Sequence, residues 1–463
     1  PHEADRRRRH PLRHELHPAV SRAEVAALCA AVALVAAGCG SDYAAPARPP
    51  VATGPPDVVR IALTDFRWPL DPALARGRDE TTLARALYST PLRTDPATGK
   101  VVPGLCTAWK ASRGFRHWAF TCNHTAPSIA AALRRVVRLR DAPARWVFAQ
   151  AERISADATT LNIRLRFSWR RFPYALTAIG AAPRFVEGPF KLVSGTKRRV
   201  VARREGLRLQ FRRLGARAAV REFRQGKLDE APVPLGDIVA TKADAQLGSA
   251  VRARTLLGLD VVGLGPIGYR LQRAYRDTAD RVDYEELISE LAGSSAYGFL
   301  GREEADPARF RRALDAIPSL PRRFVRIYIP PASALRAGAR LLYAQWRDVG
   351  LGPQLSTGPL PPAHANFQRV LAVYPQEEAI PAELILRNEL KPRDVLLRAL
   401  AATQQRPDLE LVDEALWVSA RAIPIAWVVD ARLVSPRLER WRQDVLGDVD
   451  YAAVRSRASS RRP

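Results

Sequence analysis

The chain lacks methionine altogether and has few of the residues that bind metals, with four cysteines and seven histidines among 463 residues. It contains no Cys-x-x-Cys pair, so the common cysteine-based zinc site is excluded. Lysine and arginine outnumber acidic residues by 73 to 47, yet no block of basic residues occurs apart from Arg6–Arg9. Aromatic and basic residues do not alternate as they do in RNA-binding modules. We therefore expect no metal, no cofactor and no nucleic-acid partner.

The residues that are present give the composition of an ordinary globular protein. Apolar residues make up 47% and charged residues 26% of the chain, for a net charge of +26. These fractions exclude a wholly disordered or collagen-like chain. At about 150 residues per domain, the length corresponds to about three domains. The basic excess is almost all arginine, is spread along the chain and accompanies abundant alanine and proline, which indicates GC-rich coding more than a binding surface.

Residues 1–38 have the composition of an export signal. Arginines are frequent before residue 24, and Val25–Gly38 is an uncharged run of small apolar residues. As a helix this run spans about 21 Å, too short to cross a bilayer but typical of a secretory signal. It ends in Ala36-Ala37-Gly38-Cys39, which resembles a bacterial lipobox; the alternative is a short buried helix. We expect residues 1–38 to be a lipoprotein signal peptide, Cys39 to carry the lipid that anchors the protein to the membrane, and the proline-rich residues 39–57 to form a tether.

Two cysteines, Cys106 and Cys122, remain in the exported part of the chain. Between them, Trp109, Trp118 and Phe120 have the spacing of apolar positions on two strands around a turn at 112–114. Paired strands bring opposing Cβ atoms within about 5.5 Å of each other, and an oxidising compartment lets such a cysteine pair close. We predict a Cys106–Cys122 disulfide, and two reduced cysteines in the core are the alternative.

Hydrophobic periodicity predicts alternating helices and strands along the exported chain. Apolar residues at helical spacing, together with capping residues, predict helices at 79–88, 126–138, 216–224, 306–317, 333–349 and 408–421. Alternating or continuous apolar runs predict strands at 58–62, 161–167, 207–211, 324–329 and 425–429. This irregular alternation favours α/β lobes over a repeat array.

Several short motifs follow one another along the chain. The most specific is Asp95–Trp109, DPATGKVVPGLCTAW, which is preceded by LDPALARG at Leu70–Gly77. Further motifs are GPFKL at 188–192, GKLD at 226–229, ADR at 279–281, the segment 342–351 and the pair Tyr374-Pro375. In this order they resemble family 5 of the extracellular solute-binding proteins, the peptide, nickel and oligosaccharide receptors of ABC importers. The resemblance runs from about residue 58 to residue 455.

The resemblance implies an α/β fold, a two-lobed clamp like that of periplasmic binding proteins, with a third small subdomain and mixed sheets. It implies lobe one at 58–100, 185–262 and 375–463, the small subdomain at 101–184 and lobe two at 263–374. The ligand would lie between the lobes, and hinge closure would bury it.

The same resemblance implies a function without covalent chemistry, so the protein is not expected to be an enzyme. We expect a monomeric lipoprotein at the outer face of the cytoplasmic membrane. It would capture a peptide-like or other small polar ligand and deliver it to an ABC permease with its ATPase. The alternative is a lipid-anchored ligand sensor or envelope-assembly factor on the same fold.

Four residues are candidates for ligand contact: Tyr374, and Asp65, Arg67 and Trp68 in the loop after the first strand. The alternatives are a surface ion pair between Asp65 and Arg67 and a Trp68 that packs on its own lobe. In oligopeptide-binding members of the family, an Asp before the Tyr-Pro pair holds the ligand's amino group, whereas Val373 stands there in this chain. A peptide with a free amino terminus is therefore a weaker candidate than the resemblance alone implies.

Three other patterns compete with this interpretation. Gly263–Gly268 fits the dinucleotide fingerprint GxGxxG, but Pro266 lies inside the required turn. Ser194–Lys197 fits the SxxK pattern of penicillin-interacting enzymes, but the companion motifs are missing. His117 and His124 could meet across the predicted hairpin and hold a metal. For all three patterns we favour ordinary structural roles: a strand crossover, a turn, and surface or strand histidines.

Overall fold

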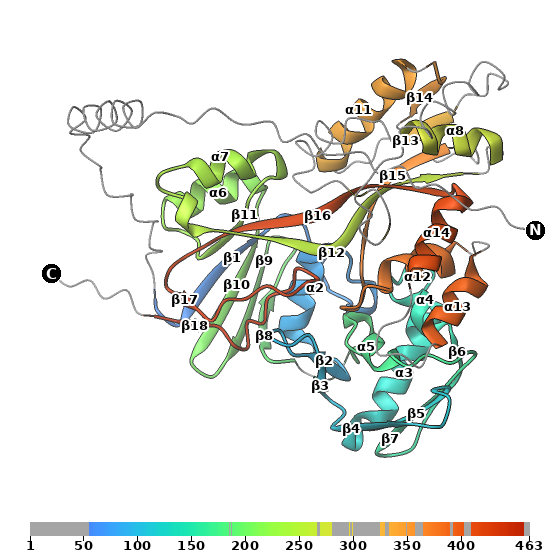
Figure 1. Cartoon of the computed structure of the whole chain (residues 1–463). Coiled ribbons are helices and arrows are strands. Elements are labelled where there is room, and N and C mark those ends of the chain that lie inside the picture. The colour runs from blue at the N-terminus through green and yellow to red at the C-terminus, as the bar shows by residue number, and fades with distance from the viewer. Residues whose placement is uncertain are drawn as a thin grey trace, which may run out of the picture. The chain divides into compact units, whose positions relative to one another are not determined.

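The computed structural model of the chain describes residues 55–184, 186, 188–265, 269–279, 296, 299, 325–328, 333–348, 350–356, 364–388, 392–401 and 409–457 (Figure 1). The predicted signal peptide, lipidated Cys39, nearly all of the tether and the predicted helix at 306–317 lie outside these residues. Within the described part of the chain, no helix is both long and apolar enough to cross a bilayer.

Ten strands form one mixed sheet in the order β14-β13-β15-β12-β16-β11-β1-β10-β9-β8. β13 pairs in parallel with β14 and β15, and β1 pairs in parallel with β10 and β11. The other neighbours are antiparallel, and the long strands β12 and β16 lie side by side between the two parallel groups (Figure 1). The strands are β1 Val58–Leu63, β8 Lys191–Gly195, β9 Arg199–Arg204, β10 Leu207–Arg213, β11 Glu230–Pro232, β12 Val251–Leu264, β13 Val325–Tyr328, β14 Pro353–Ser356, β15 His364–Leu371 and β16 Ala422–Val434.

The central strands are apolar because both faces of the sheet are covered there. β1 shows this most simply: Ile61 packs in one hydrophobic cluster with Leu83, whereas its neighbour Ala62 packs in another with Phe223. Leu83 belongs to α2 (Gly77–Leu87) and Phe223 to α6 (Ala216–Arg224), so the two helices cover opposite faces. Gly258 in β12 permits a close approach of β15, since a Cβ there would lie 2.5 Å from Leu371 Cδ2.

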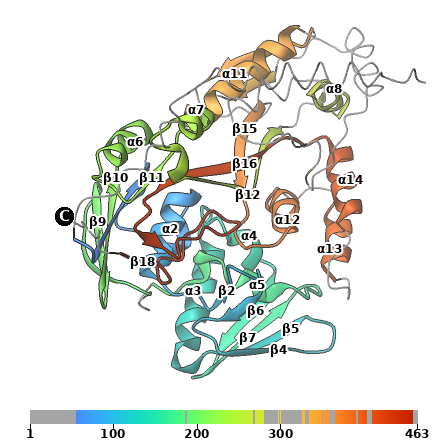
Figure 2. The same ribbon diagram turned by 60° about the vertical axis from the view of Figure 1, so that its left-hand side comes forward.

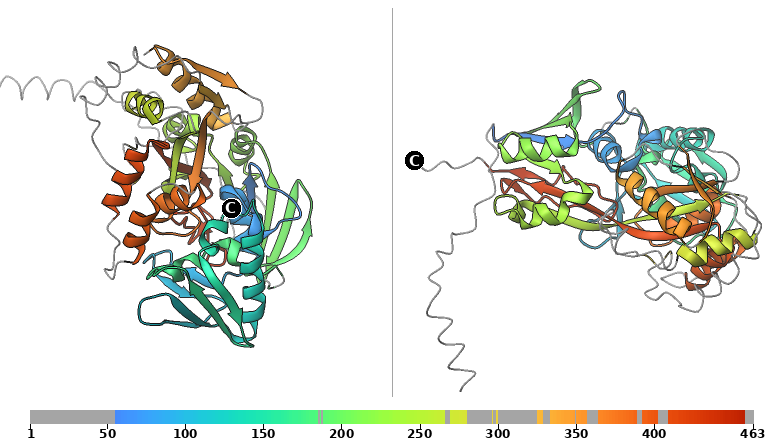
Figure 3. Two further views of the ribbon diagram at one scale, coloured as in Figure 1. Left: turned by 90° about the vertical axis from the view of Figure 1, so that its right-hand side faces the viewer. Right: turned by 90° about the horizontal axis from the view of Figure 1, so that it is seen from above.

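Other helices form smaller groups. α11 contacts β13, β14, β15 and α8, whereas α12, α13 and α14 contact one another (Figures 2 and 3). Within the described residues, the other α-helices are α3 Ala126–Arg138, α4 Arg145–Phe148, α5 Phe172–Ala175, α7 Ile238–Ala243, α8 Tyr269–Ala279, α11 Ser333–Asp348, α12 Ala379–Arg387, α13 Arg393–Ala401 and α14 Glu410–Ser419.

A separate four-stranded antiparallel sheet lies within the predicted small subdomain. Its strand order is β4-β5-β7-β6, and α3 packs against β6 and β7 (Figure 2). Its strands are β4 Ala108–Ala111, β5 His117–Thr121, β6 Ala151–Ala156 and β7 Thr160–Leu165. The described residues also contain two short antiparallel pairs: β2 Leu92–Thr94 with β3 Val101–Pro103, and β17 Leu438–Glu439 with β18 Arg455–Ser456.

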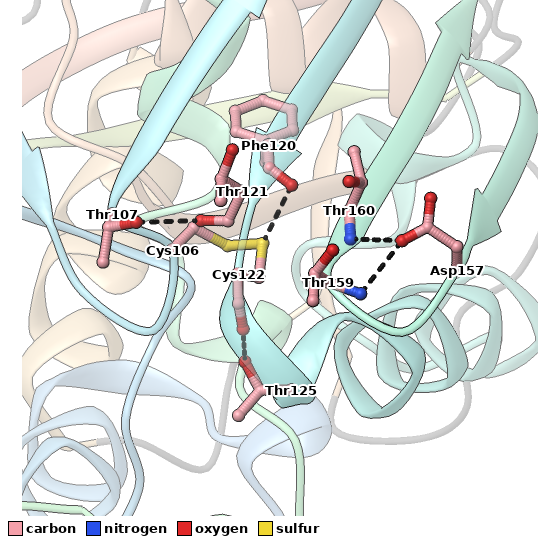
Figure 4. The surroundings of a disulfide bond; sticks show 9 residues. All are labelled: Cys106, Thr107, Phe120, Thr121, Cys122, Thr125, Asp157, Thr159 and Thr160. Atoms are coloured by element: carbon pink, nitrogen blue, oxygen red, sulfur yellow. Dashed lines mark hydrogen bonds between the residues drawn. A yellow bond between two sulfur atoms is a disulfide. The ribbon is translucent and has the colours of Figure 1, made fainter.

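The predicted disulfide between Cys106 and Cys122 is confirmed (Figure 4). The two cysteines flank the antiparallel pair β4–β5, in which Trp109 is opposite Phe120. Both cysteines are fully buried, and Thr125 Oγ1 donates a hydrogen bond to the Cys122 carbonyl at 2.6 Å. The disulfide therefore closes the base of the β4–β5 hairpin inside the core of the predicted small subdomain.

The three competing patterns have structural places in the described chain. Gly263 lies at the end of β12, where it pairs with β15 on one side and β16 on the other; α8 begins at Tyr269, and residues 266–268 lie outside the described residues, so the turn of this pattern is not tested. Ser194 lies in β8, and Thr196 follows in the turn to β9 rather than at the start of a buried helix. His117 and His124 are both exposed, and the described residues contain no group of three side chains suited to a metal ion.

Candidate ligand-binding site

A large open cavity of about 1060 Å³, here called the cleft cavity, lies where the central strands meet the β1–α2 loop and α6. Its volume matches the upper range of pockets that hold small-molecule ligands. Residues from seven separate stretches of the chain line it, among them Asp65, Arg221, Arg369 and Asp430. The described lining includes six arginines and four aspartates, so charges of both signs face the cavity.

The floor of the cleft cavity is a network of paired charges. Arg432, which is 1% exposed, donates to Asp79 Oδ1 at 3.0 Å and to the Ala62 carbonyl at 3.1 Å. Arg78 Nε lies 2.6 Å from Asp430 Oδ2, and its Nη2 lies 3.4 Å from Glu230 Oε1. Because buried charges are costly unless they are paired, these contacts bind α2 and the strands β11 and β16 to one another.

The pKa values in this network are set by burial and by the opposite charges. Burial would lower the pKa of Arg78, but the carboxylates of Asp430, Glu230 and Asp79 raise it above its usual value. Burial raises the pKa of Glu230 and of Asp430, and Arg78 opposes both shifts. Arg78 therefore stays charged, and it stabilises the ionised form of both carboxyls.

Arg369 supplies a second paired charge on the cavity wall. It lies on β15, and its Nε and Nη2 donate to the two carboxylate oxygens of Asp260 on β12, each at 2.8 Å. Asp260 is fully buried, and burial would lower the pKa of Arg369, but this fork-like pairing raises it. The guanidinium is thus fixed in position across two neighbouring strands.

Asp65 is the one predicted ligand residue that lines the cleft cavity. The side chain of Asp79 fixes its loop, because Asp79 Oδ2 accepts from the backbone N–H groups of Thr64 at 2.6 Å and of Asp65 at 3.2 Å. The Asp65 carboxylate is 74% exposed and lies 2.5 Å from Arg213 Nη2. It therefore does not form the ion pair with Arg67 that was the alternative expectation.

Arg67 and Trp68 contact residues of α2 and β8 and do not line the cleft cavity. Arg67 pairs with Glu80, its Nε donating to Oε1 and its Nη2 to Oε2, both at 2.7 Å. Burial would raise the pKa of Glu80, but this pairing and the backbone N–H groups of Arg76 and Arg67 lower it. Trp68 is half-buried and covers Gly195 on β8, where an added Cβ would lie 2.0 Å from its Cζ2.

Tyr374 is fully buried and does not line the cleft cavity. Its ring lies 6.0 Å from that of Trp146 and 6.2 Å from that of Trp169, both in the predicted small subdomain. Burial, together with the charge of Glu378, raises the pKa of Tyr374 well above its usual range. Arg171 of the same subdomain donates to Glu378 Oε2 at 3.2 Å, so the segment after β15 is tied to that subdomain.

A smaller cavity of about 70 Å³, here called the side pocket, adjoins the cleft cavity. The two share Gly77 and Leu371 in their walls. Val373, which stands where the resemblance places an Asp that holds a ligand amino group, lines the side pocket. The three residues before the Tyr-Pro pair, Leu371, Ala372 and Val373, all line the side pocket, while Tyr374 itself is buried in the core.

Sequence reasoning missed the charged residues of the central strands. Asp430 and Arg432 interrupt the apolar strand AIPIAWVVDARLV, and Asp260 and Arg369 lie in β12 and β15. Charged residues inside an otherwise apolar strand are costly to bury, so they indicate a site or an internal ion pair. That pattern was available in the sequence, but the partners were not, because they lie on α2 or on another strand, far away in the chain.

Comparison with known proteins gives similarity in structure but not in sequence. No model of a known protein family matches the chain, and no curated protein matches it. Haemophilus influenzae OppA in complex with RPPGFSPFR superposes with a TM-score of 0.71 at 15% identity, over 86% of this chain and 99% of that one.

The Escherichia coli murein tripeptide binding protein MppA gives a TM-score of 0.70 at 16% identity, over 84% of this chain and 96% of that one. NikZ from Campylobacter jejuni, in complex with Ni(L-His), gives a TM-score of 0.67 at 15% identity, over 85% of this chain and 97% of that one. The TM-scores show that the fold is shared, and sequence identities this low show no more than the fold. The chain therefore has the mixed α/β clamp fold of the family 5 solute-binding proteins that its sequence resembles.

Proposed function

We propose that this protein is the substrate-binding lipoprotein of an ABC importer, which captures a peptide-like or other small polar ligand and delivers it to a membrane permease. The observation that carries the proposal is the cleft cavity of about 1060 Å³ at the central strands of a clamp fold shared with peptide- and nickel-binding proteins. Such clamps act by hinge closure around a ligand.

The chemistry of the cavity suits binding rather than catalysis. Most arginines and aspartates of the described lining have an ion-pair partner, as Arg432 has in Asp79 and Arg369 in the buried Asp260. Paired, fixed charges of both signs give a polar surface for the amide and charged groups of a peptide-like ligand. No step that makes or breaks a covalent bond is needed, so we propose that the protein is not an enzyme.

Location at the outer face of the cytoplasmic membrane belongs to the same proposal. The lipobox-like Ala36-Ala37-Gly38-Cys39 supports lipid anchoring through Cys39, with residues 39–57 as the tether. The Cys106–Cys122 disulfide supports export, because disulfides form and persist in oxidising compartments. A monomer with the predicted lobe and subdomain boundaries would present its cleft to a permease and its ATPase.

A thermal-shift screen of the purified protein tests the proposal. The panel contains short peptides with free and acetylated amino termini, oligosaccharides and Ni²⁺ with and without histidine. A ligand at 100 times its Kd adds about 2.7 kcal/mol to the free energy of unfolding. We expect saturable stabilisation by one class of ligand. If no compound of the panel raised the melting temperature, the result would contradict ligand capture and would favour the envelope-assembly role.

A matched pair of variants locates the binding. Gly236 lines the cleft cavity, and a Cβ there would meet no atom within 4 Å, so Gly236→Trp adds a large side chain in the cavity. Val239, three residues later, is 80% exposed and does not line the cavity, so Val239→Trp is the control. We expect Gly236→Trp to remove the stabilisation and Val239→Trp to retain it. Equal stabilisation of both variants would place the ligand elsewhere.

A further inference from the structure

The side pocket has mostly apolar walls, with Thr81, Arg85 and Asp448 as its polar side chains. Its lining comes from the segment before α2, from 143–144, from 178–180 and from the end of β15, and it includes Pro72, Ala144, Ile179, Leu371, Val373 and Leu446. Ala144 and Ile179 are buried, and Val373 is half-buried. A group that enters this pocket therefore leaves water and contacts aliphatic side chains.

The few polar groups of the side pocket are already paired with one another. Thr81 Oγ1 donates to Asp448 Oδ1 at 2.8 Å, and Arg85 pairs through its Nε with Asp448 Oδ2. Arg85 Nη2 also donates to the carbonyl of Thr177 at 3.3 Å. Among the lining residues that the structure describes, Asp448 is the one with a carboxylate, and it is 4% exposed. The positive charge of Arg85 compensates that carboxylate. A ligand ammonium in the pocket would lack an unshared counter-charge, and burying an unpaired charge is strongly unfavourable.

The volume of the side pocket limits what can enter it. A cavity of about 150 Å³ holds benzene, and this pocket of about 70 Å³ has half that volume. It therefore admits an acetyl or isopropyl group and excludes an aromatic ring. An extended chain cannot pass through so small a space, so the group that enters is a terminus or a short side chain.

We propose that the side pocket binds the acylated, uncharged end of a peptide-like ligand, so that the protein selects blocked peptides over peptides with a free amino terminus. This inference rests on the proposed capture of a ligand in the cleft cavity, with which the pocket shares Gly77 and Leu371. Val373 supplies an aliphatic wall at the place where a carboxylate would instead attract an ammonium group.

Calorimetric titration of the purified protein with three probes tests the inference: N-acetyl-trialanine, free trialanine and N-benzoyl-trialanine. We expect N-acetyl-trialanine to bind at least tenfold more tightly than either of the others. Binding of free trialanine as tight as that of the acetylated probe would overturn the blocked-end inference and leave ligand capture in place. Binding of N-benzoyl-trialanine as tight as that of the acetylated probe would also overturn it, through the size argument.

The variant Val373→Asp tests the same inference from the side of the protein. We expect this variant to bind N-acetyl-trialanine at least tenfold more weakly than the unaltered protein does, and to bind free trialanine more tightly. Val193→Asp, at a valine that is 53% exposed on β8, makes the same chemical change away from both cavities and should leave the two affinities unchanged. An unchanged preference in Val373→Asp would overturn the inference, and failure of all three probes to bind the unaltered protein would overturn peptide capture as well.

Discussion

Glu383 on α12 is predicted to make the protein less stable as the pH rises. Its side chain is 9% exposed, and only Oε1 has a partner among the described residues, Arg387 Nη1 at 3.1 Å. Burial raises the pKa of Glu383 from 4.5 to about 7, and the charge of Arg387 opposes the shift. Arg387 is 63% exposed, so water screens its charge and leaves the carboxyl without a strong counter-ion.

The magnitude follows from the difference between the folded and unfolded pKa values. A carboxyl with a raised pKa contributes its full stability below pH 4.5 and loses it between pH 4.5 and about 7, where only the unfolded chain ionises. At 1.36 kcal/mol per pH unit, this shift corresponds to about 3 kcal/mol. Glu383→Gln mimics the protonated side chain and keeps the acceptor for Arg387. It should match the unaltered protein at pH 4.5 and exceed its free energy of unfolding by about 3 kcal/mol at pH 8.

Urea denaturation of both proteins at pH 4.5 and pH 8 measures this difference. Glu80→Gln is the matched control, because pairing with Arg67 lowers the pKa of Glu80 despite its burial. Glu80 therefore contributes stability above its unfolded pKa and loses it as the pH falls, so Glu80→Gln should weaken the protein at pH 8. A Glu383→Gln effect that is equal at the two pH values would refute the reasoning for Glu383.

Three further predictions concern the core. Replacing both Cys106 and Cys122 by serine opens a loop of 16 residues and should lower the free energy of unfolding by about 3 kcal/mol in urea, with no loss expected if the bond does not form. Arg432→Met leaves the carboxylates of the cavity floor short of a partner and should cost about 3–5 kcal/mol by the same assay; a cost under about 1 kcal/mol would contradict the network. Gly195→Ala should displace Trp68, shift its fluorescence to longer wavelength and cost about 1–3 kcal/mol. That cost should shrink in a Trp68→Ala background, and an equal cost there would disprove the contact.

Much of the fold could be predicted from local patterns. α3 and α6 begin and end where the apolar spacing predicted, because each packs one apolar stripe and the signal is continuous along it. β16 is longer than the predicted strand at 425–429, because Asp430 and Arg432 break the apolar run that defined it. Their charges are compensated by Arg78 and Asp79 on α2, which lies far away in the sequence, so periodicity could not indicate that the strand continues.

The candidate site was less predictable for the same reason. The resemblance indicated that the loop after the first strand faces the cleft, and Asp65 does line the cavity. It could not distinguish Arg67 and Trp68, which lie close to Asp65 in sequence but contact Glu80 on α2 and Gly195 on β8. Burial of Tyr374 depends on two tryptophans from another subdomain, and no local pattern reports such a contact. Which residues face a cavity is a property of tertiary packing.

The most direct test of the account is calorimetric titration of the stabilising ligand into the unaltered protein, Gly236→Trp and Val239→Trp. We expect one saturable site that is retained in Val239→Trp and lost in Gly236→Trp, because Gly236 lines the cleft cavity and Val239 does not. Saturable binding that is the same in all three proteins would contradict ligand capture in the cleft cavity.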